Sequence, residues 1–162
     1  MISLLCVGKN KEKALRLLED EYVKRLSAFT KIEVIELKDE PNRHVDRSQE
    51  VDKIKEQEAK RVLAKIQDRD WVVLLDLHGK MMDSVAFSQS LETWNQKASR
   101  LVFVIAGSLG PHKSLIQRAD FKLKLGDMTF THLMTRILIL EQIYRAYMIQ
   151  NGPSYPKENV FF

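Results

Sequence analysis

Short runs of β-favouring apolar residues alternate along this chain with helical patterns, and this alternation most constrains the fold. The runs are ISLLCV (2–7), KIEVIEL (31–37), WVVLLDL (71–77), LVFVIA (101–106) and FKLKL (121–125). Helical patterns lie between them at about residues 11–27, 46–66, 83–96, 112–118 and 131–150. Strands that take turns with helices predict an α/β domain with a mostly parallel sheet flanked by helices.

The composition of each run predicts its place in that sheet. Runs 71–77 and 101–106 are almost continuously apolar, which is typical of central strands covered on both faces. Runs 31–37 and 121–125 alternate apolar and polar residues. We therefore expect these two strands nearer the edges.

The length of the chain predicts one domain. Its 162 residues can bury a sizeable core, and no linker, repeat or low-complexity tract divides residues 1–162. The apolar runs are too short to span a bilayer and the N-terminus lacks a signal-peptide pattern, so we expect a soluble, cytoplasmic protein. The single cysteine, Cys6, lies within the first apolar run, which predicts a core residue rather than a reactive thiol.

The net charge of +4 suggests an anionic partner, and residues 71–162 carry more of the excess than residues 1–70. Basic side chains near the expected strand ends could contact phosphates: Lys80, Lys113, Arg118, Lys122 and Lys124. A solvated face explains the same residues equally well. Charge alone leaves both interpretations open.

Two helical segments have distinct surfaces. The charge-dense segment 46–66 predicts a solvated helix with one buried stripe; a nucleic-acid arm is the alternative. Segment 131–150 is apolar over more than one face, so it needs two burial surfaces. The second surface is either another copy of the chain in a two-fold dimer or, for a fully buried central helix, the same domain.

The usual signatures of metal and nucleotide chemistry are absent. The histidines are scattered without an HExxH motif, and one cysteine cannot build a zinc site, so no metal is expected. GxSxG and Walker motifs are missing too, and Gly107-Ser-Leu-Gly110 falls short of GxGxxG. These observations disfavour a standard dinucleotide fold.

Loops at the carboxyl ends of the strands remain as candidate ligand sites. Open α/β sheets bind ligands at this edge, where DLHGK (76–80), AGSLGP (106–111) and GDMTF (126–130) are expected to meet. Gly107 and Gly110 permit a close backbone approach or a positive φ, and Pro111 suits the first turn of a helix. A plain strand-to-helix turn without a ligand remains the alternative for 106–111.

Polar residues also mark the last helix. His132, Arg136, Glu141 and Arg145 could form a site or be paired charges, because Glu141 and Arg145 are four residues apart on the helix.

Several segments together resemble a known family. They are MISLLCVGK, EYVKRLSAFTKIEVIEL, LLDLHGK, VFVIAGSLG and, most specifically, MTFTHLMTRILILEQIYRAY. In this order they resemble RlmH, the small SPOUT-class methyltransferases of bacterial large-subunit ribosomal RNA. The resemblance covers about residues 1–155.

The resemblance implies a SPOUT-type α/β fold with a deep C-terminal trefoil knot, the knot and cofactor pocket lying at about residues 71–155. It further implies a homodimer through helix 131–150 that uses S-adenosyl-L-methionine. The implied activity is methylation of N3 of a pseudouridine in the helix 69 loop of 23S rRNA on the assembled 70S ribosome. A catalytically impaired ribosome-binding or assembly factor and a SPOUT tRNA methyltransferase are the alternatives.

The resemblance also carries site residues to this chain. The implied cofactor contacts are Leu75, Ala106, Gly107, Leu125, Gly126, Asp127, Met128, Thr129 and Phe130. Arg136 is the candidate that stabilises the ring anion, and His132 the one that orients the base or accepts its proton; a structural role for His132 stays open. Tyr155 is a candidate RNA contact.

Three positions depart from the family pattern. Ala106 replaces the first glycine of a usual pair, which places a methyl group where the backbone would approach the cofactor. Thr131 replaces a proline and can cap the last helix instead. Pro156 stands where family members have a histidine, so a role for that histidine has no support in this chain.

Overall fold

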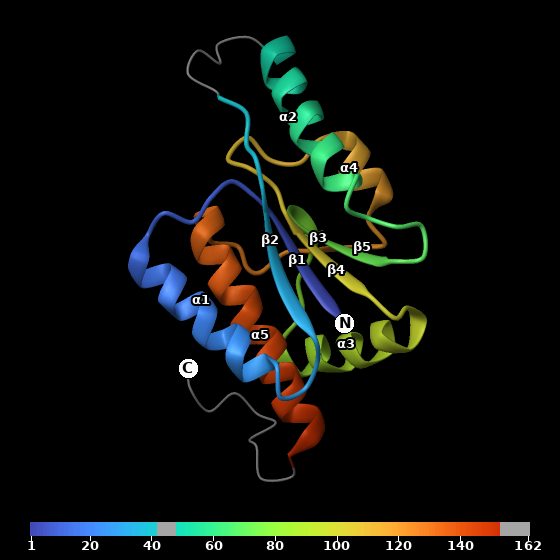
Figure 1. The fold of residues 1–162 in the computed structure, drawn as a ribbon. Helices are drawn as coiled ribbons and strands as arrows, with labels where there is room; N and C mark the ends of the chain where they lie inside the picture. The colour runs from blue at the N-terminus through green and yellow to red at the C-terminus, as the bar shows by residue number, and fades with distance from the viewer. Residues whose placement is uncertain (42–47, 153–162) are drawn as a thin grey trace.

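A computed structural model describes residues 1–41 and 48–152 as a parallel sheet between two layers of helices (Figure 1). The strands are β1 (Ile2–Val7), β2 (Ile32–Leu37), β3 (Trp71–Lys80), β4 (Leu101–Ile105) and β5 (Phe121–Leu123). The helices are α1 (Lys13–Leu26), α2 (Ser48–Leu63), α3 (Ser84–Lys97), α4 (Lys113–Arg118) and α5 (His132–Asn151). The predicted α/β class is confirmed.

The strands are ordered β2-β1-β4-β3-β5, and every neighbouring pair is parallel. Strands β2 and β5, whose sequences alternate apolar and polar residues, form the two edges of the sheet, as predicted. Each of them pairs with only one neighbouring strand. Since all strands run the same way, their carboxyl ends meet at one edge of the sheet. β3 continues three residues beyond its predicted end, and its pairing with β5 shifts register between Leu75 and Lys80.

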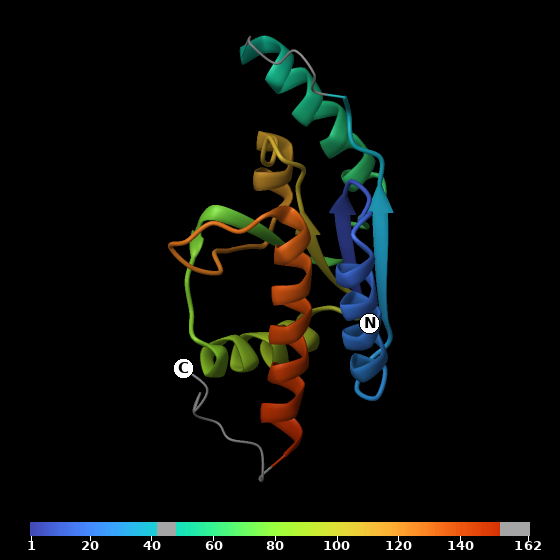
Figure 2. The same cartoon turned by 90° about the vertical axis from the view of Figure 1, so that its left-hand side faces the viewer.

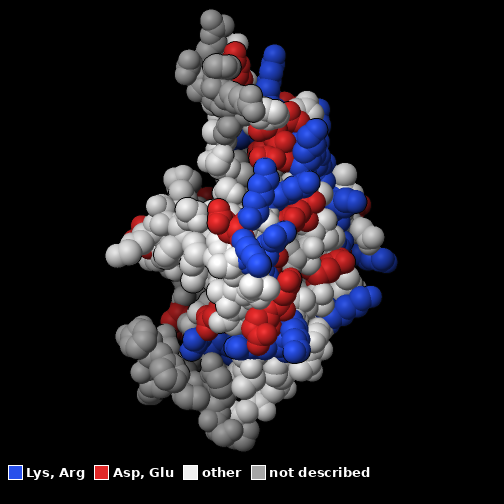
Figure 3. All heavy atoms as spheres, turned by 60° about the vertical axis from the view of Figure 1, so that its left-hand side comes forward, with Lys and Arg blue, Asp and Glu red and all other residues white. Residues whose placement is uncertain are grey.

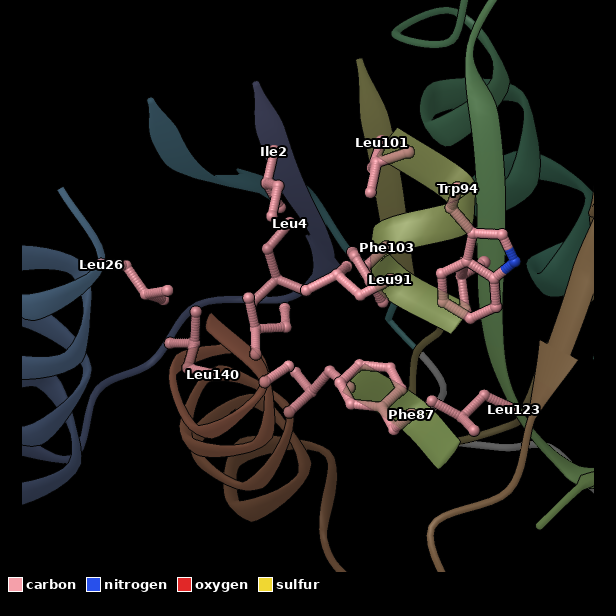
Figure 4. Close-up of a cluster of buried hydrophobic side chains, with 14 of the residues drawn as sticks. Ile2, Leu4, Leu26, Phe87, Leu91, Trp94, Leu101, Phe103, Leu123 and Leu140 are labelled. Atoms are coloured by element: carbon pink, nitrogen blue, oxygen red, sulfur yellow. The ribbon is translucent and has the colours of Figure 1, made fainter. Parts of the chain in front are cut away.

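The larger core lies between the sheet and helices α1, α3 and α5 (Figure 4). Leu4 and Phe103 extend from β1 and β4 toward Leu140 of α5 and Phe87 of α3. Cys6 belongs to this cluster with no exposed surface, as predicted, and burial raises the pKa of its thiol to about 12. A thiol with so high a pKa stays protonated and unreactive at neutral pH.

The smaller core lies on the opposite face of the sheet, where α2 and α4 pack. Leu5, Val72 and Val104 from the strands meet Val62 of α2 and Leu115 of α4. None of the described helices has the length and apolar character needed to cross a membrane.

Helix α5 lies beside α1 and α3 on the face of the sheet, as the side view shows (Figure 2). Its buried side chains include Ile139, Leu140 and Ile143, and Tyr147 stacks on Phe29 with ring centroids 5.7 Å apart. The same domain thus covers much of this apolar helix. Met134, at 38% exposure, still presents apolar surface to solvent in the single chain.

Candidate functional site

A cavity of about 700 Å³ lies at the carboxyl edge of the sheet, where three strand-end segments converge. Cavities that hold small ligands in proteins fall in this size range. Its walls come from the second half of β3, from the segments that follow β4 and β5, and from the start of α5. The predicted meeting of the three loops is therefore observed.

The first wall of the cavity is the second half of β3 and begins at Leu75, which is half-buried. The next residue, Asp76, is buried, and its Oδ1 accepts the backbone N–H of His78 at 2.9 Å. This bond lies within the stretch where the β3–β5 register shifts. Leu77 then lies at the cavity with 60% of its surface exposed.

The middle wall is the turn between β4 and α4. The N–H of Gly110 donates to the carbonyl of Gly107 at 2.9 Å, and Gly110 has a φ of +89°, which favours glycine. His112 caps α4, because its Nδ1 accepts the N–H of Ser114. Helix α4 begins only at Lys113, so the expectation that Pro111 occupies its first turn is wrong: Pro111 precedes the cap.

The third wall is the segment between β5 and α5. Oγ1 of Thr131 accepts the N–H of Met134 at 3.2 Å, so Thr131 is the N-cap expected from its place before the helix. This cap makes His132 the first residue of α5 and leaves it at the cavity. Met128 and Phe130 line the same cavity with 79% and 46% of their surfaces exposed.

Most of the expected cofactor contacts share this cavity. Lining residues from that set are Leu75, Ala106, Gly107, Leu125, Gly126, Met128, Thr129 and Phe130. Asp127 does not line it; its carboxylate accepts Nζ of Lys124 at 2.9 Å on the surface. An apolar cavity with a glycine turn fits an adenosyl group, whose flat ring needs close backbone approach.

The two candidate catalytic residues lie in different surroundings. His132 lines the cavity, and its pKa is lowered by burial and by the positive charge of Arg136, which Asp39 partly opposes. Arg136 has no exposed surface and is absent from the cavity lining in the described residues. Its Nη1 donates to Oε2 of Glu36 at 2.6 Å and its Nη2 to the Gly8 carbonyl at 2.8 Å.

The expected RNA contacts are spread over the molecule. Lys80 and Lys122 are exposed and line one shallow groove of about 430 Å³ beside β3 and β5. Lys113 is exposed at the start of α4, and Lys124 lines the main cavity while paired with Asp127. Tyr155 lies outside the described residues. On the face in Figure 3, Lys and Arg are interleaved with Asp and Glu.

Arg118 is held by structural bonds. Its Nη2 donates to the carbonyls of Gln67 and Asp70, both at 2.9 Å, and its Nη1 to Asp120 at 3.1 Å. These partners precede β3 and β5, so they lie at the amino edge of the sheet, opposite the cavity. The paired charges expected at Glu141 and Arg145 do form, with Nε donating to Oε1 at 3.0 Å.

Sequence reasoning missed a buried carboxylate, Glu58 of α2, which is only 6% exposed. Burial raises its pKa, and the N–H of Glu40 donates to it at 3.0 Å. A signal was present: Glu58 is four residues from both Ile54 and Val62, so it falls within the apolar stripe of the helix.

In the described part of the chain, one group of side chains that can ligate metals lies close together: Asp52, Glu56 and His112. Because Nδ1 of His112 accepts the Ser114 N–H, the proton of the neutral ring lies on Nε2, which faces Asp52 at 3.7 Å. In this arrangement Nε2 is placed to donate to the Asp52 carboxylate. This group is better explained as a contact between α2 and the α4 cap.

Comparison with known families shows to which family this chain belongs. A family model described as "Predicted SPOUT methyltransferase" matches residues 1–155. The chain belongs to the RlmH family of SPOUT methyltransferases. Members of this family take their methyl group from S-adenosylmethionine, so the cavity between the three strand ends is the candidate site for that cofactor.

Proposed function

We propose that this protein methylates N3 of a pseudouridine in the helix 69 loop of 23S rRNA on the assembled 70S ribosome, in the cytoplasm. The observation that supports this most is the convergence of Leu75, the Ala106-Gly107 turn and segment 125–130 on one cavity with His132 at its wall. The methyl group and its leaving group come from S-adenosylmethionine. The protein has to align the acceptor and remove its proton.

His132 is suited to the proton step. N3 of a uracil ring is weakly acidic, so transfer needs a base of suitable pKa within reach. A lowered pKa keeps His132 neutral at physiological pH, when a ring nitrogen can accept a proton. In this proposal His132 orients the base and takes the N3 proton.

Arg136 has a different part in the proposal. Its guanidinium is bonded to Glu36 and to the Gly8 carbonyl, and one turn of α5 separates it from His132. We therefore assign Arg136 to positioning His132 rather than to touching the base. If His132→Ala retains normal single-turnover methylation of ribosomes, His132 is not the base.

The assembly is also part of the proposal. We infer a deep trefoil knot within about residues 71–155 and a two-fold dimer through residues 131–150, whose exposed Met134 is apolar. Lys80, Lys113, Lys122 and Lys124 are the proposed phosphate contacts. Analytical ultracentrifugation tests the dimer, because a monomer at micromolar concentration contradicts it.

Ala106 favours the alternative of a ribosome-binding factor without activity, because its side chain lines the cavity where a glycine pair would leave more room. Transfer of labelled methyl groups to 70S ribosomes, free subunits and tRNA in parallel separates the candidates. We expect labelling of 70S ribosomes. Labelling of tRNA alone supports the tRNA enzyme, and absence of S-adenosylmethionine binding in calorimetry supports the factor.

A further inference from the structure

Glu58 is a buried carboxylate on a helix whose other charges are mostly exposed. A carboxylate out of water is costly unless hydrogen bonds compensate it. Helix α2 extends beyond the end of the sheet (Figure 1), and Glu58 lines a small cavity together with Gly107 and His132 of the candidate cofactor cavity. The position of the buried Glu58 carboxylate therefore suggests that it has a role at the carboxyl edge of the sheet.

The carboxylate of Glu58 joins two segments that lead away from strands. Oε2 accepts the N–H of Glu40, three residues after β2, at 3.0 Å. A Cβ built on Gly107, two residues after β4, would lie 2.9 Å from Oε1 and 3.3 Å from Oε2. Real Cβ atoms essentially never approach another atom within 3.0 Å, so Glu58 sits directly against the glycine of the middle wall.

A small cavity of about 70 Å³ lies beside this contact. Glu58, Gly107 and His132 all line it, together with Asp39 and Glu40. Gly107 and His132 also line the main cavity. The Glu58 side chain thus supports the Gly107 turn from outside the main cavity, whose lining does not include it.

We propose that Glu58 is a positioning residue that fixes the Gly107 turn for the methyl donor and makes glycine the preferred residue at position 107. The inference rests on the proposed function, since it assigns the cavity to S-adenosylmethionine. A side chain at position 107 would have to displace the Glu58 carboxylate or move the turn into the main cavity. The end of a glutamate side chain can shift more easily than backbone, so the burial of Glu58 and its bond from the Glu40 N–H are what oppose the first movement.

A double-mutant cycle tests the contact, with S-adenosylmethionine affinity measured by calorimetry. Because the added methyl group meets the Glu58 oxygens, we expect Gly107→Ala to weaken binding about tenfold in the wild-type chain. In a Glu58→Ala background the same change should cost less than about threefold, because the oxygens that the new methyl group meets are gone. Val7 Cγ1, 3.3 Å from the built Cβ, accounts for the remainder.

Two further backgrounds separate size from charge and guard against misfolding. Glu58→Gln keeps the volume, so Gly107→Ala should cost there what it costs in wild type. Glu58→Asp withdraws the carboxylate by one methylene and should reduce the cost even if Glu58→Ala does not fold. Glu56→Ala is the control on the same helix, because Glu56 is half exposed and lies near Lys60.

The outcomes are distinct. Effects of Gly107→Ala that are equal within about twofold in all four Glu58 backgrounds overturn the inference while wild-type binding upholds the cofactor site. Wild-type protein that fails to bind S-adenosylmethionine overturns the proposed function, and this inference with it. A KM for S-adenosylmethionine that rises in Glu58→Ala with little change in kcat supports positioning over general destabilisation.

Discussion

Replacing Arg136 by methionine should strongly destabilise the fold. The guanidinium is fully buried, donates to Glu36 and to the Gly8 carbonyl, and has Oε1 of Glu19 3.7 Å away. Methionine retains much of the side-chain volume but removes the charge. Breaking a fully buried ion pair costs about 3–5 kcal/mol, but the Glu36 side chain is 36% exposed and water can solvate its charge, so we expect a loss of about 2–3 kcal/mol.

The pH dependence of this loss identifies its cause. Burial alone would raise the pKa of Glu36, but hydrogen bonds from Arg136 and the Asn10 N–H outweigh it and lower the pKa below its usual value. A lowered pKa in the folded state means that Glu36 stabilises above its unfolded pKa, and this stabilisation is lost as pH falls through the folded pKa. Burial raises the pKa of Glu19, so Glu19 is neutralised earlier on acidification.

Urea unfolding of Arg136→Met and wild type, measured at pH 7 and near pH 4, is the assay. The difference in the free energy of unfolding should be large at pH 7. It should begin to shrink near pH 4, where Glu19 is neutralised while Glu36, whose pKa is lowered, still keeps part of its charge. Lys60→Met is the matched control, because Lys60 belongs to an exposed pair with Glu56 and should change stability little. A loss below about 1 kcal/mol at pH 7, or one that is independent of pH, refutes the reasoning.

Three other predictions concern the walls of the site. Thr131→Ala removes the α5 cap and should cost about 1 kcal/mol in thermal unfolding, whereas Thr131→Ser should cost little. Lys80→Ala with Lys122→Ala should reduce the salt dependence of ribosome binding by about two counterions; an unchanged slope removes both from the interface. Because the pKa of His132 is lowered, single-turnover methylation should persist below the usual histidine pKa and then fall; retention of that fall in His132→Ala contradicts the assignment.

The sequence predicted the elements well because their patterns are local. β-favouring runs such as LVFVIA separated by helical periods indicated a parallel sheet, and its carboxyl edge indicated where the loops meet. The cap at Thr131 could be expected because a threonine stands directly before the predicted last helix.

The surroundings of individual polar side chains could not be predicted in the same way. In the sequence, Arg136 was a candidate to contact the substrate base. In the fold it is buried, because Glu36 and Gly8, about a hundred residues or more away in sequence, lie beside it. Arg118 is held by carbonyls at the opposite edge for the same reason. Such contacts depend on tertiary geometry, which periodicity does not contain.

The most direct test of the central claim is to locate the methyl group on the RNA. A methyl group at N3 occupies the base-pairing edge, so it stops reverse transcription at the modified nucleotide. Ribosomes lacking this modification, incubated with the protein and S-adenosylmethionine, should show a new stop in the helix 69 loop that is absent without the cofactor. A new stop elsewhere, or no stop with a protein that binds the cofactor, would contradict the account.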